Sequence, residues 1–208
     1  AAEMLSPEIT IDLYHGANVS VCALSRELCN LTSSGRLRLF KLDEDNLDGC
    51  SYSKLMTTKK FWQERGATDK TLVFQTDSIL CKKSAYTIHN FTHLDYVGSR
   101  AYDGWSLEGG NGGLRLVDTS LSLGCSSELG TPSGCGCAED AYFIKCIKKA
   151  GGRLGSSKEQ EAFGTQNYFA DRSFGAHQAN IELTWTDNKS ITTFRDYCPE
   201  YLRSMKLL

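Results

Sequence analysis

The sequence predicts a single α/β domain in which strands and helices alternate. One observation is the run at residues 71–80, where Leu-Val-Phe follow one another without polar alternation, as in a strand buried on both faces of a helix-covered sheet. A second is the pair of segments at residues 51–65 and 138–150, in which apolar side chains recur at helical spacing up to a glycine. A third is composition, because 208 residues with 40% hydrophobic content can bury one sizeable core.

The first part of the chain is expected to run strand, helix, strand, helix before the central strand at residues 71–80. Apolar residues alternate with polar ones in the expected strands and recur three or four positions apart in the expected helices. Ser51 is expected to cap the second helix and Gly66 to end it. The four elements are strands at residues 9–14 and 36–42 and helices at residues 20–31 and 51–65.

The second part of the chain is expected to contain a glycine-rich segment and further helices. Four glycines surround Asn111 ahead of an apolar run, which is typical of a backbone that bends tightly or is approached closely. The C-terminal segment, which contains Phe194, Tyr197 and Tyr201 and ends at Leu208, is expected to fold back as a short helix. The remaining segments are a short stretch at residues 95–98, a glycine-rich run at 109–117, a weakly helical stretch at 120–125 and a clear helix at 138–150.

Charge and hydropathy argue against two kinds of partner. Lys and Arg number 23 against 25 Asp and Glu, and the formal net charge of −2 provides no field that would attract nucleic acid. A run of about 18 apolar residues, the length that spans a bilayer, is absent from the sequence. We therefore expect no nucleic acid partner and no membrane segment.

The cysteines are interpreted as reduced thiols of a cytoplasmic protein. There are nine, an odd number, and several lie in apolar segments where cysteine behaves as a small hydrophobic residue. Cys135 and Cys137 are separated by one residue, whereas zinc hairpins have two to four between their ligands. A structural zinc site is therefore not expected.

Four asparagines begin formal N-glycosylation sequons, which matter only in a secretory pathway. The first residues have neither the basic nor the apolar region of a secretion signal, so we interpret the sequons as coincidence. The four are Asn18, Asn30, Asn90 and Asn188.

Several polar residues spread along the chain form a set suited to a divalent metal and a diphosphate. Asp77 follows the expected central strand, at the end where open α/β sheets bind ligands. Asn111 is bracketed by glycines, Glu139 and Asp140 open a helix, and His177 is the last of four histidines. Each feature has a structural alternative: a turn, a hairpin, a helix cap and a buried or surface histidine, respectively.

With the motifs around them, these residues resemble a family of small glycosyltransferases with a GT-A fold. The similarity is greatest to the glycosyltransferase domains that large chlorella viruses encode to decorate their capsid protein, and it covers more than half of the chain. The motifs are Phe61-Trp62, Phe74-Gln75-Thr76-Asp77-Ser78, Tyr96-Val97-Gly98, Gly110-Asn111-Gly112-Gly113, Glu139-Asp140-Ala141-Tyr142-Phe143 and Phe174-Gly175-Ala176-His177.

The resemblance implies a GT-A-like domain with a central mixed sheet of about six strands flanked by helices. It implies an enzyme of the hexosyltransferase type that takes a UDP-sugar donor, requires Mn²⁺ or Mg²⁺ and serves a glycan or glycoprotein acceptor. The setting it implies is viral capsid glycan synthesis in the host cytoplasm. Residues 1–208 would then be one glycosyltransferase domain, and the resemblance leads us to expect that it belongs to a longer polypeptide.

The resemblance also implies roles for individual residues. Asp77 and His177 would bind the metal, although the family's Asp-x-Asp motif has Gln75 at its first position here, which puts chelation by two carboxylates in doubt. Hard divalent ions take carboxylate and phosphate oxygens, and Mn²⁺ also accepts an imidazole nitrogen. Asp140 is the catalytic candidate, and Glu139 its neighbour in sugar or acceptor binding.

Donor binding is assigned to three regions of the sequence. The residues expected to contact the donor are Thr76 and Asp77, the turn of Asn111, Gly112 and Gly113, and, for the nucleoside, Tyr14, His15 and Gly16. The runner-up function is a non-catalytic nucleotide- or sugar-binding domain, suggested by the missing first carboxylate. A two-metal phosphohydrolase is disfavoured because the sequence lacks a cluster of carboxylates.

Overall fold

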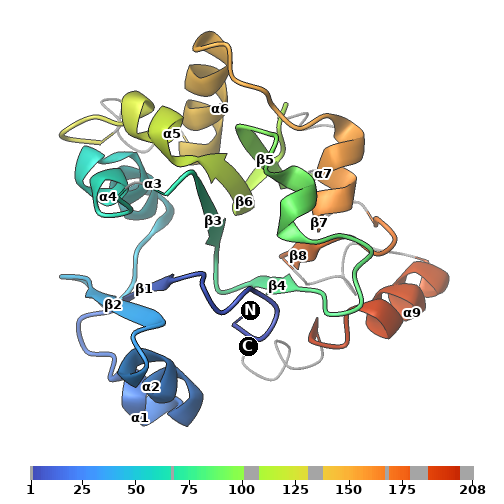
Figure 1. Ribbon diagram of the computed structural model, residues 1–208, viewed down its shortest axis with the longest axis horizontal. Coiled ribbons are helices and arrows are strands. Elements are labelled where there is room, and N and C mark those ends of the chain that lie inside the picture. The colour runs from blue at the N-terminus through green and yellow to red at the C-terminus, as the bar shows by residue number, and fades with distance from the viewer. Residues whose placement is uncertain are drawn as a thin grey trace. The chain divides into compact units, whose positions relative to one another are not determined.

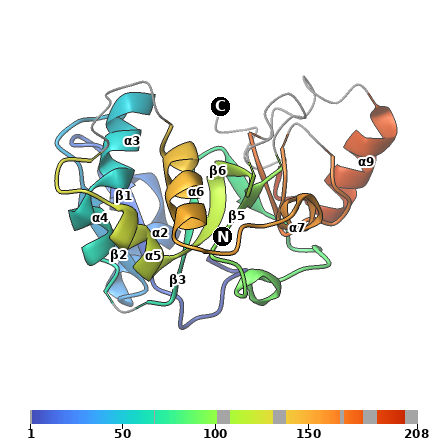
Figure 2. The ribbon, with the colours of Figure 1, turned by 90° about the horizontal axis from the view of Figure 1, so that it is seen from above.

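The computed structural model describes residues 2–66, 68–100, 108–130, 138–166, 169–178 and 187–201 of the chain (Figures 1 and 2). The chain divides into two compact units, Ala1–Tyr52 and Ser53–Leu208. Strands and helices occur in both, so the prediction of a mixed α/β protein is confirmed. Among the described residues, no helix combines the length and apolar character needed to cross a membrane.

The first unit is built on two parallel strands, β1 (Ile11–His15) and β2 (Leu37–Lys41). The connection contains α1 (Val21–Leu24) and α2 (Arg26–Ser33), so the single helix predicted at residues 20–31 is wrong. Ser25 separates the two helices because its backbone is extended and its hydroxyl accepts a hydrogen bond from Leu28 N, which caps α2. The preference of serine for this capping position outweighs the continuous apolar spacing.

The helix predicted at residues 51–65 is likewise divided, into α3 (Gly49–Thr57) and α4 (Lys59–Gln63). Thr58 between them has an extended backbone, and its hydroxyl accepts a hydrogen bond from Phe61 N. Its backbone also forms a bridge to Ser127, a contact that the local sequence does not reveal.

The sheet that organises the second unit has the order β3-β6-β5, with all neighbours antiparallel. Its middle strand is β6 (Asn111–Asp118), which is almost entirely buried, and β5 (Tyr96–Ser99) lies at one side. β3 (Lys70–Phe74) pairs with β6 alone among the described strands, and Phe74 is 38% exposed. The prediction that residues 71–80 hold a central strand buried on both faces is therefore wrong. An apolar run shows that a strand forms but does not show whether a second neighbour covers its other edge.

A second sheet of three short strands has the order β4-β8-β7. It consists of β4 (Ser78–Leu80), β8 (Gly175–His177) and β7 (Gly164–Thr165), and Ser78 lies opposite His177. The described strands thus form three small sheets rather than one sheet of about six strands. The two sheets of this unit meet at Gly113, whose carbonyl accepts hydrogen bonds from Gln75 N at 2.8 Å and Ser78 Oγ at 3.0 Å.

Helices cover both sheets of the second unit. α5 (Thr119–Cys125) and α6 (Glu139–Lys149) lie together beside β6, as Figure 1 shows. α6 agrees with the helix predicted at residues 138–150 to within one residue at each end. The remaining helices in the described part of the chain are a short 3₁₀ turn, η1 (Ile88–Phe91), α7 (Ser157–Phe163) and α9 (Asn188–Tyr197). α9 buries Phe194 and Tyr197 in a cluster with Ala176 of β8.

Within the described ranges seven cysteines are disulfide-bonded, so their interpretation as reduced thiols is wrong. The partners of each described pair lie with their Cα atoms 4.5 to 5.9 Å apart, although they are as many as 117 positions apart in sequence. Spacing along the chain could not reveal these approaches, because the fold creates them. The bonds are Cys22–Cys29, Cys81–Cys198 and Cys125–Cys146, and Cys50 is also in a disulfide. The cytoplasmic prediction loses its main premise but stays untested, and Cys135 and Cys137 lie outside the described residues.

Candidate functional site

Three polar side chains converge where β3 gives way to β4 and where β8 ends. Gln75 and Asp77 lie in the link between β3 and β4, and His177 is the last residue of β8. His177 Nε2 lies 3.2 Å from Gln75 Oε1 and 3.4 Å from Asp77 Oδ1. The structure thus brings together Asp77 and His177, which are 100 positions apart in sequence, and adds Gln75. We call these three residues the Gln75–Asp77–His177 cluster.

The electrostatics of the cluster favour an ionised carboxylate. A hydrogen bond from the His177 ring, although long, lowers the pKa of the Asp77 carboxyl from its ordinary value and outweighs the opposing effect of burial. The Asp77 side chain is 38% exposed, whereas that of His177 is 3% exposed. Asp77 therefore presents a negative charge at the surface, and His177 supports it from inside.

The cluster fits a hard divalent cation by its donor atoms. It offers one carboxylate, one imidazole nitrogen and one amide oxygen, and neighbouring ligands of an octahedral ion of this size lie about 3 Å apart, close to the observed separations. Asp77 Oδ1 and His177 Nδ1 are buried and have no well-formed hydrogen bond within the described residues. Those residues contain no group of three or more His, Cys, Asp or Glu side chains placed to hold a metal. Any such site therefore depends on the Gln75 amide as its third protein ligand.

Gly113 leaves the space that the His177 ring occupies. A Cβ at this position would lie 2.0 Å from Nε2 and 2.2 Å from Cε1 of His177, far inside van der Waals contact. The amide N–H of Gly113 donates a hydrogen bond to Oδ1 of Asn111, two residues earlier in the chain, at 2.9 Å. Asn111, Gly112 and Gly113, which were predicted to form a turn, are therefore the first residues of strand β6.

Asp140 is held against the adjacent glycine. Its Oδ2 accepts a hydrogen bond from Gly112 N at 3.1 Å, and its Oδ1 accepts one from Ala141 N at 2.7 Å. The side chain is buried in the first turn of α6, and the residue at the cap position is Ala138, which has no capping side chain. Neither Asp140 nor Glu139 occupies the N-cap position, but Asp140 accepts a hydrogen bond from one N–H of the first turn, which is part of what a capping residue does. Each oxygen of Asp140 retains a second lone pair.

Glu139 forms a buried ion pair. Its Oε1 lies 2.7 Å from Nη1 of Arg115, whose side chain is 0% exposed, and Arg115 also donates to Gly112 O at 2.7 Å. Ser53 Oγ donates to the other carboxylate oxygen at 3.4 Å. Glu139 therefore ties α6 to β6, which is a structural use of a residue that we predicted to contact sugar or acceptor.

The two halves of the predicted site meet at adjacent residues of β6. The Asp140 side chain lies against Gly112, and the His177 ring lies against Gly113. Successive residues of an extended strand direct their substituents to opposite faces. The acidic pair and the Gln75–Asp77–His177 cluster are thus joined through two glycines but do not form one continuous cluster.

The residues predicted for the nucleoside lie in the first unit. Tyr14 stacks on Phe40 with ring centroids 4.8 Å apart, and His15 Nδ1 lies 3.0 Å from Gly16 O. A Cβ on Gly16 would lie 2.2 Å from Asp45 O, so its lack of a side chain serves packing. Thr76, by contrast, is exposed beside Asp77 in the turn after β3.

Two residues of the site were not predicted as participants. Gln75 was treated only as a departure from Asp-x-Asp, although its position two residues before Asp77 was a usable signal. Arg115 lies in an apolar run of buried β6, and a charged residue in such a run requires a buried partner. The partner, Glu139, could be identified only from the fold.

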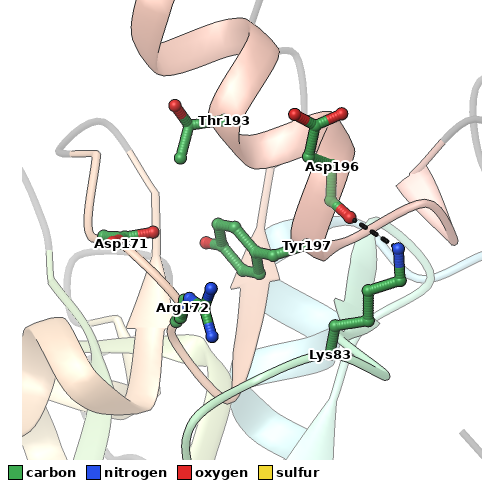
Figure 3. A pocket seen from close by; sticks show the side chains of 6 residues that line it. All are labelled: Lys83, Asp171, Arg172, Thr193, Asp196 and Tyr197. Carbon is green, nitrogen blue, oxygen red and sulfur yellow. Dashed lines mark hydrogen bonds between the residues drawn. The ribbon is translucent and has the colours of Figure 1, made fainter.

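A separate pocket of about 380 Å³ lies between α9 and the loop before β8 (Figure 3). Its walls carry two basic and two acidic side chains, and Lys83 Nζ donates to Asp196 O at 3.1 Å. This balance of charge singles out no class of ligand, and none of the predicted site residues lines the pocket. The lining residues are Lys83, Asp171, Arg172, Thr193, Asp196 and Tyr197.

Comparison with known proteins identifies a family but no activity. The family model described as "Protein of unknown function (DUF5672)" matches residues 36–177, more than half of the chain. The chain belongs to the DUF5672 family. No curated protein and no solved structure matches it.

The DUF5672 match covers most of the candidate site. It extends from the start of β2 to the end of β8 and so contains Gln75, Asp77, the β6 glycines, the acidic pair and His177. Tyr14, His15 and Gly16 precede the matched range. The range shared with the family therefore includes the whole Gln75–Asp77–His177 cluster.

Gly113→Ala should displace the His177 ring and destabilise the fold by about 1–3 kcal/mol, the usual cost of overpacking a buried position. Gly124→Ala in α5 is the matched control, because a Cβ there meets nothing within 4 Å. In a helix the control change should be neutral or slightly stabilising. Denaturant unfolding of both variants measures the difference, and equal stabilities would show that the ring does not need the space at Gly113.

Proposed function

We propose that this DUF5672 protein is a metal-dependent glycosyltransferase of GT-A type, which moves a sugar, of hexose type, from a UDP-sugar to a glycan or glycoprotein acceptor. The observation that carries the proposal is the convergence of Asp77, His177 and Gln75 at the end of β3. The resemblance of the surrounding motifs to small glycosyltransferases supplies the reaction class. A setting in viral capsid glycan synthesis rests on that resemblance alone.

The proposed metal is Mn²⁺ or Mg²⁺, held by Asp77, His177 and the Gln75 amide oxygen. When bound, such an ion neutralises the charge of a diphosphate leaving group. Asp77 is the only charged ligand of the three at neutral pH if His177 binds as neutral imidazole. One protein charge leaves the ion a net positive charge, which favours recruitment of an anionic diphosphate.

The sugar of the donor is assigned to the start of β6. The space left by the missing side chains of Gly112 and Gly113 is filled by Asp140 and His177, so these glycines place both residues beside Asn111. The hydrogen bond from Gly113 N to Asn111 Oδ1 fixes the Asn111 carboxamide. The Asn111 amide group, Nδ2, is then left to donate to sugar hydroxyls. Thr76 supplies an exposed hydroxyl next to Asp77 for the diphosphate end of the same donor.

Asp140 is assigned the catalytic role. Two backbone N–H groups hold its carboxylate in place, which suits a fixed negative charge near a developing oxocarbenium ion. The remaining lone pairs could also accept the proton of an acceptor hydroxyl. Glu139 is reassigned to positioning, because its charge is already paired with Arg115.

A GT-A-like arrangement is part of the proposal. It is supported by two features of the second unit: an antiparallel sheet with helices α5 and α6 beside it, and a second small sheet joined to it through Gly113. Under this proposal, the side chains that would bind the metal lie together where the two sheets meet. Solving the structure with UDP and Mn²⁺ would show whether the donor lies along this junction.

The alternative is a non-catalytic nucleotide- or sugar-binding domain. It is favoured by Gln75 in place of a carboxylate and by the engagement of both Glu139 and Asp140 with protein groups. Both functions require the Gln75–Asp77–His177 cluster to bind a metal and a nucleotide. Only the enzyme requires donor turnover, so binding and turnover are measured separately.

Asp77→Asn should abolish the Mn²⁺-dependent stabilisation by UDP and leave the fold intact, because the side chain is partly exposed. A ligand at a hundred times its Kd stabilises by about 2.7 kcal/mol, which for a chain of this size raises Tm by roughly 5–11 °C. The measurement is a thermal unfolding series with UDP and Mn²⁺, each alone and combined.

Asp43→Asn is the matched control, since the same change is made at an exposed carboxylate remote in sequence from the motifs. It should behave as the wild type. If UDP and Mn²⁺ stabilise wild type and Asp77→Asn equally, Asp77 is not a metal ligand. If no nucleoside diphosphate stabilises the wild type with either metal, the proposed function is wrong.

A further inference from the structure

The disulfides locate the folding of this chain in an oxidising compartment. Cys81–Cys198 joins the end of β4 to the end of α9, and Cys125–Cys146 joins α5 to α6. Cys81 and Cys198 are 1% and 0% exposed within the core cluster of α9. Structural disulfides of this kind form and persist in the secretory pathway and outside the cell, and they are rare in the cytosol.

The sequons are more numerous than chance would produce. Ser and Thr make up 37 of the 208 residues, so chance would place one two positions after about one asparagine in six, whereas four of the eight asparagines have one. None of the four sequons has proline at its middle position. Their number now agrees with the compartment that the disulfides indicate.

All four sequon asparagines are exposed, which a bulky surface glycan requires. The side chains of Asn30 and Asn188 have no partner among the described residues. Asn90 uses only its carbonyl oxygen, which accepts from Thr87 N, and so keeps its Nδ2 free. Asn18 differs, because its Nδ2 donates to Asp45 Oδ2 at 2.6 Å and a sugar on that nitrogen would crowd the contact.

We propose that the chain matures in an oxidising secretory compartment and carries N-linked glycans at Asn30, Asn90 and Asn188. In each transfer a bond forms between Nδ2 and the anomeric carbon of an oligosaccharide, the bond from that carbon to a lipid diphosphate breaks, and the amide loses one proton. Each disulfide forms by exchange with an oxidoreductase disulfide, which is reduced to two thiols as the two cysteine thiols are oxidised. This proposal replaces the cytoplasmic setting and is independent of the proposed function.

The first test uses the protein as its source cells make it. The chain is captured with an antibody, alkylated with iodoacetamide under denaturing conditions, reduced, and alkylated with N-ethylmaleimide. Half of the sample is then treated with an N-glycosidase in heavy-oxygen water and mapped by mass spectrometry. We expect the second label on the disulfide cysteines and isotopically marked aspartate at positions 30, 90 and 188.

Two outcomes would overturn the proposal. One is iodoacetamide on the disulfide cysteines, which would show reduced thiols. The other is unmodified asparagine at all three positions in a chain whose cysteines are oxidised. Neither outcome bears on nucleotide binding, which is measured with the purified protein.

Substitutions in the same cells assign each glycan. Asn30→Gln, Asn90→Gln and Asn188→Gln should each remove one step of electrophoretic mobility that glycosidase treatment also removes. Asn46→Gln is the matched control, because Asn46 is exposed but is followed by Leu-Asp and begins no sequon. Asn18→Gln should behave as this control, and a mobility shift there alone would contradict the assignment of sites.

Discussion

Asp140→Asn should lower the rate of sugar transfer by roughly two to four orders of magnitude, the range associated with losing a general base or a preorganised charge. UDP binding should be retained, because the residue is assigned to the reacting centre and not to the diphosphate. Both Asp140 oxygens accept hydrogen bonds from backbone N–H groups. In the asparagine variant the side-chain NH₂ replaces one of these oxygens and faces a backbone N–H that it cannot accept from. A modest loss of stability of about 1 kcal/mol is therefore expected as well.

Initial rates of transfer and of donor hydrolysis measure the effect, with UDP affinity from calorimetry as the binding control. Glu139→Gln is the comparison in the same helical turn: it should lower stability more than turnover, since Glu139 is paired with Arg115. If transfer by Asp140→Asn is close to that of the wild type, the carboxylate only anchors Gly112 to α6. Transfer lost together with UDP binding would also contradict the assignment, because it would place the residue in donor binding.

Arg115→Met should destabilise the protein by about 3–5 kcal/mol, the cost of leaving a buried charge without its partner. The Arg115 side chain is 0% exposed and that of Glu139 is 9% exposed, so water cannot take over the lost interaction. The double change Arg115→Met with Glu139→Met should recover much of this loss, because it removes both charges. Denaturant unfolding of the two single variants and the double variant gives the coupling energy directly.

Arg38→Met is the matched control for this cycle. Arg38 and Asp12 form an ion pair with the same 2.7 Å separation as Arg115 and Glu139, but the Arg38 side chain is 47% exposed. Exposed pairs contribute about 0–1 kcal/mol, so the same substitution should have little effect there. Equal losses at both positions would show that burial does not determine the energetics of the Arg115–Glu139 pair.

The limits of local pattern are clearest in the helices. The helix at residues 138–150 was predicted to within one residue at each end because its apolar spacing is uninterrupted and glycine follows it. The helices predicted at residues 20–31 and 51–65 were each interrupted by a hydroxyl residue, Ser25 and Thr58 respectively, that caps a new helix. Apolar periodicity continues through such a residue, so it does not reveal the interruption.

By itself the sequence determined the alternation of strands and helices, the glycine-rich start of β6 and, through motif resemblance, the pairing of Asp77 with His177. These features depend on local propensity or on the order of short motifs, both of which are present in the linear chain. Only the tertiary structure decided that β6 is the central strand, that Gln75 joins the cluster, that Glu139 is paired with Arg115 and that the cysteines are bonded. Each of these depends on contacts between segments far apart in sequence, whose energies come from burial and proximity that no single segment contains.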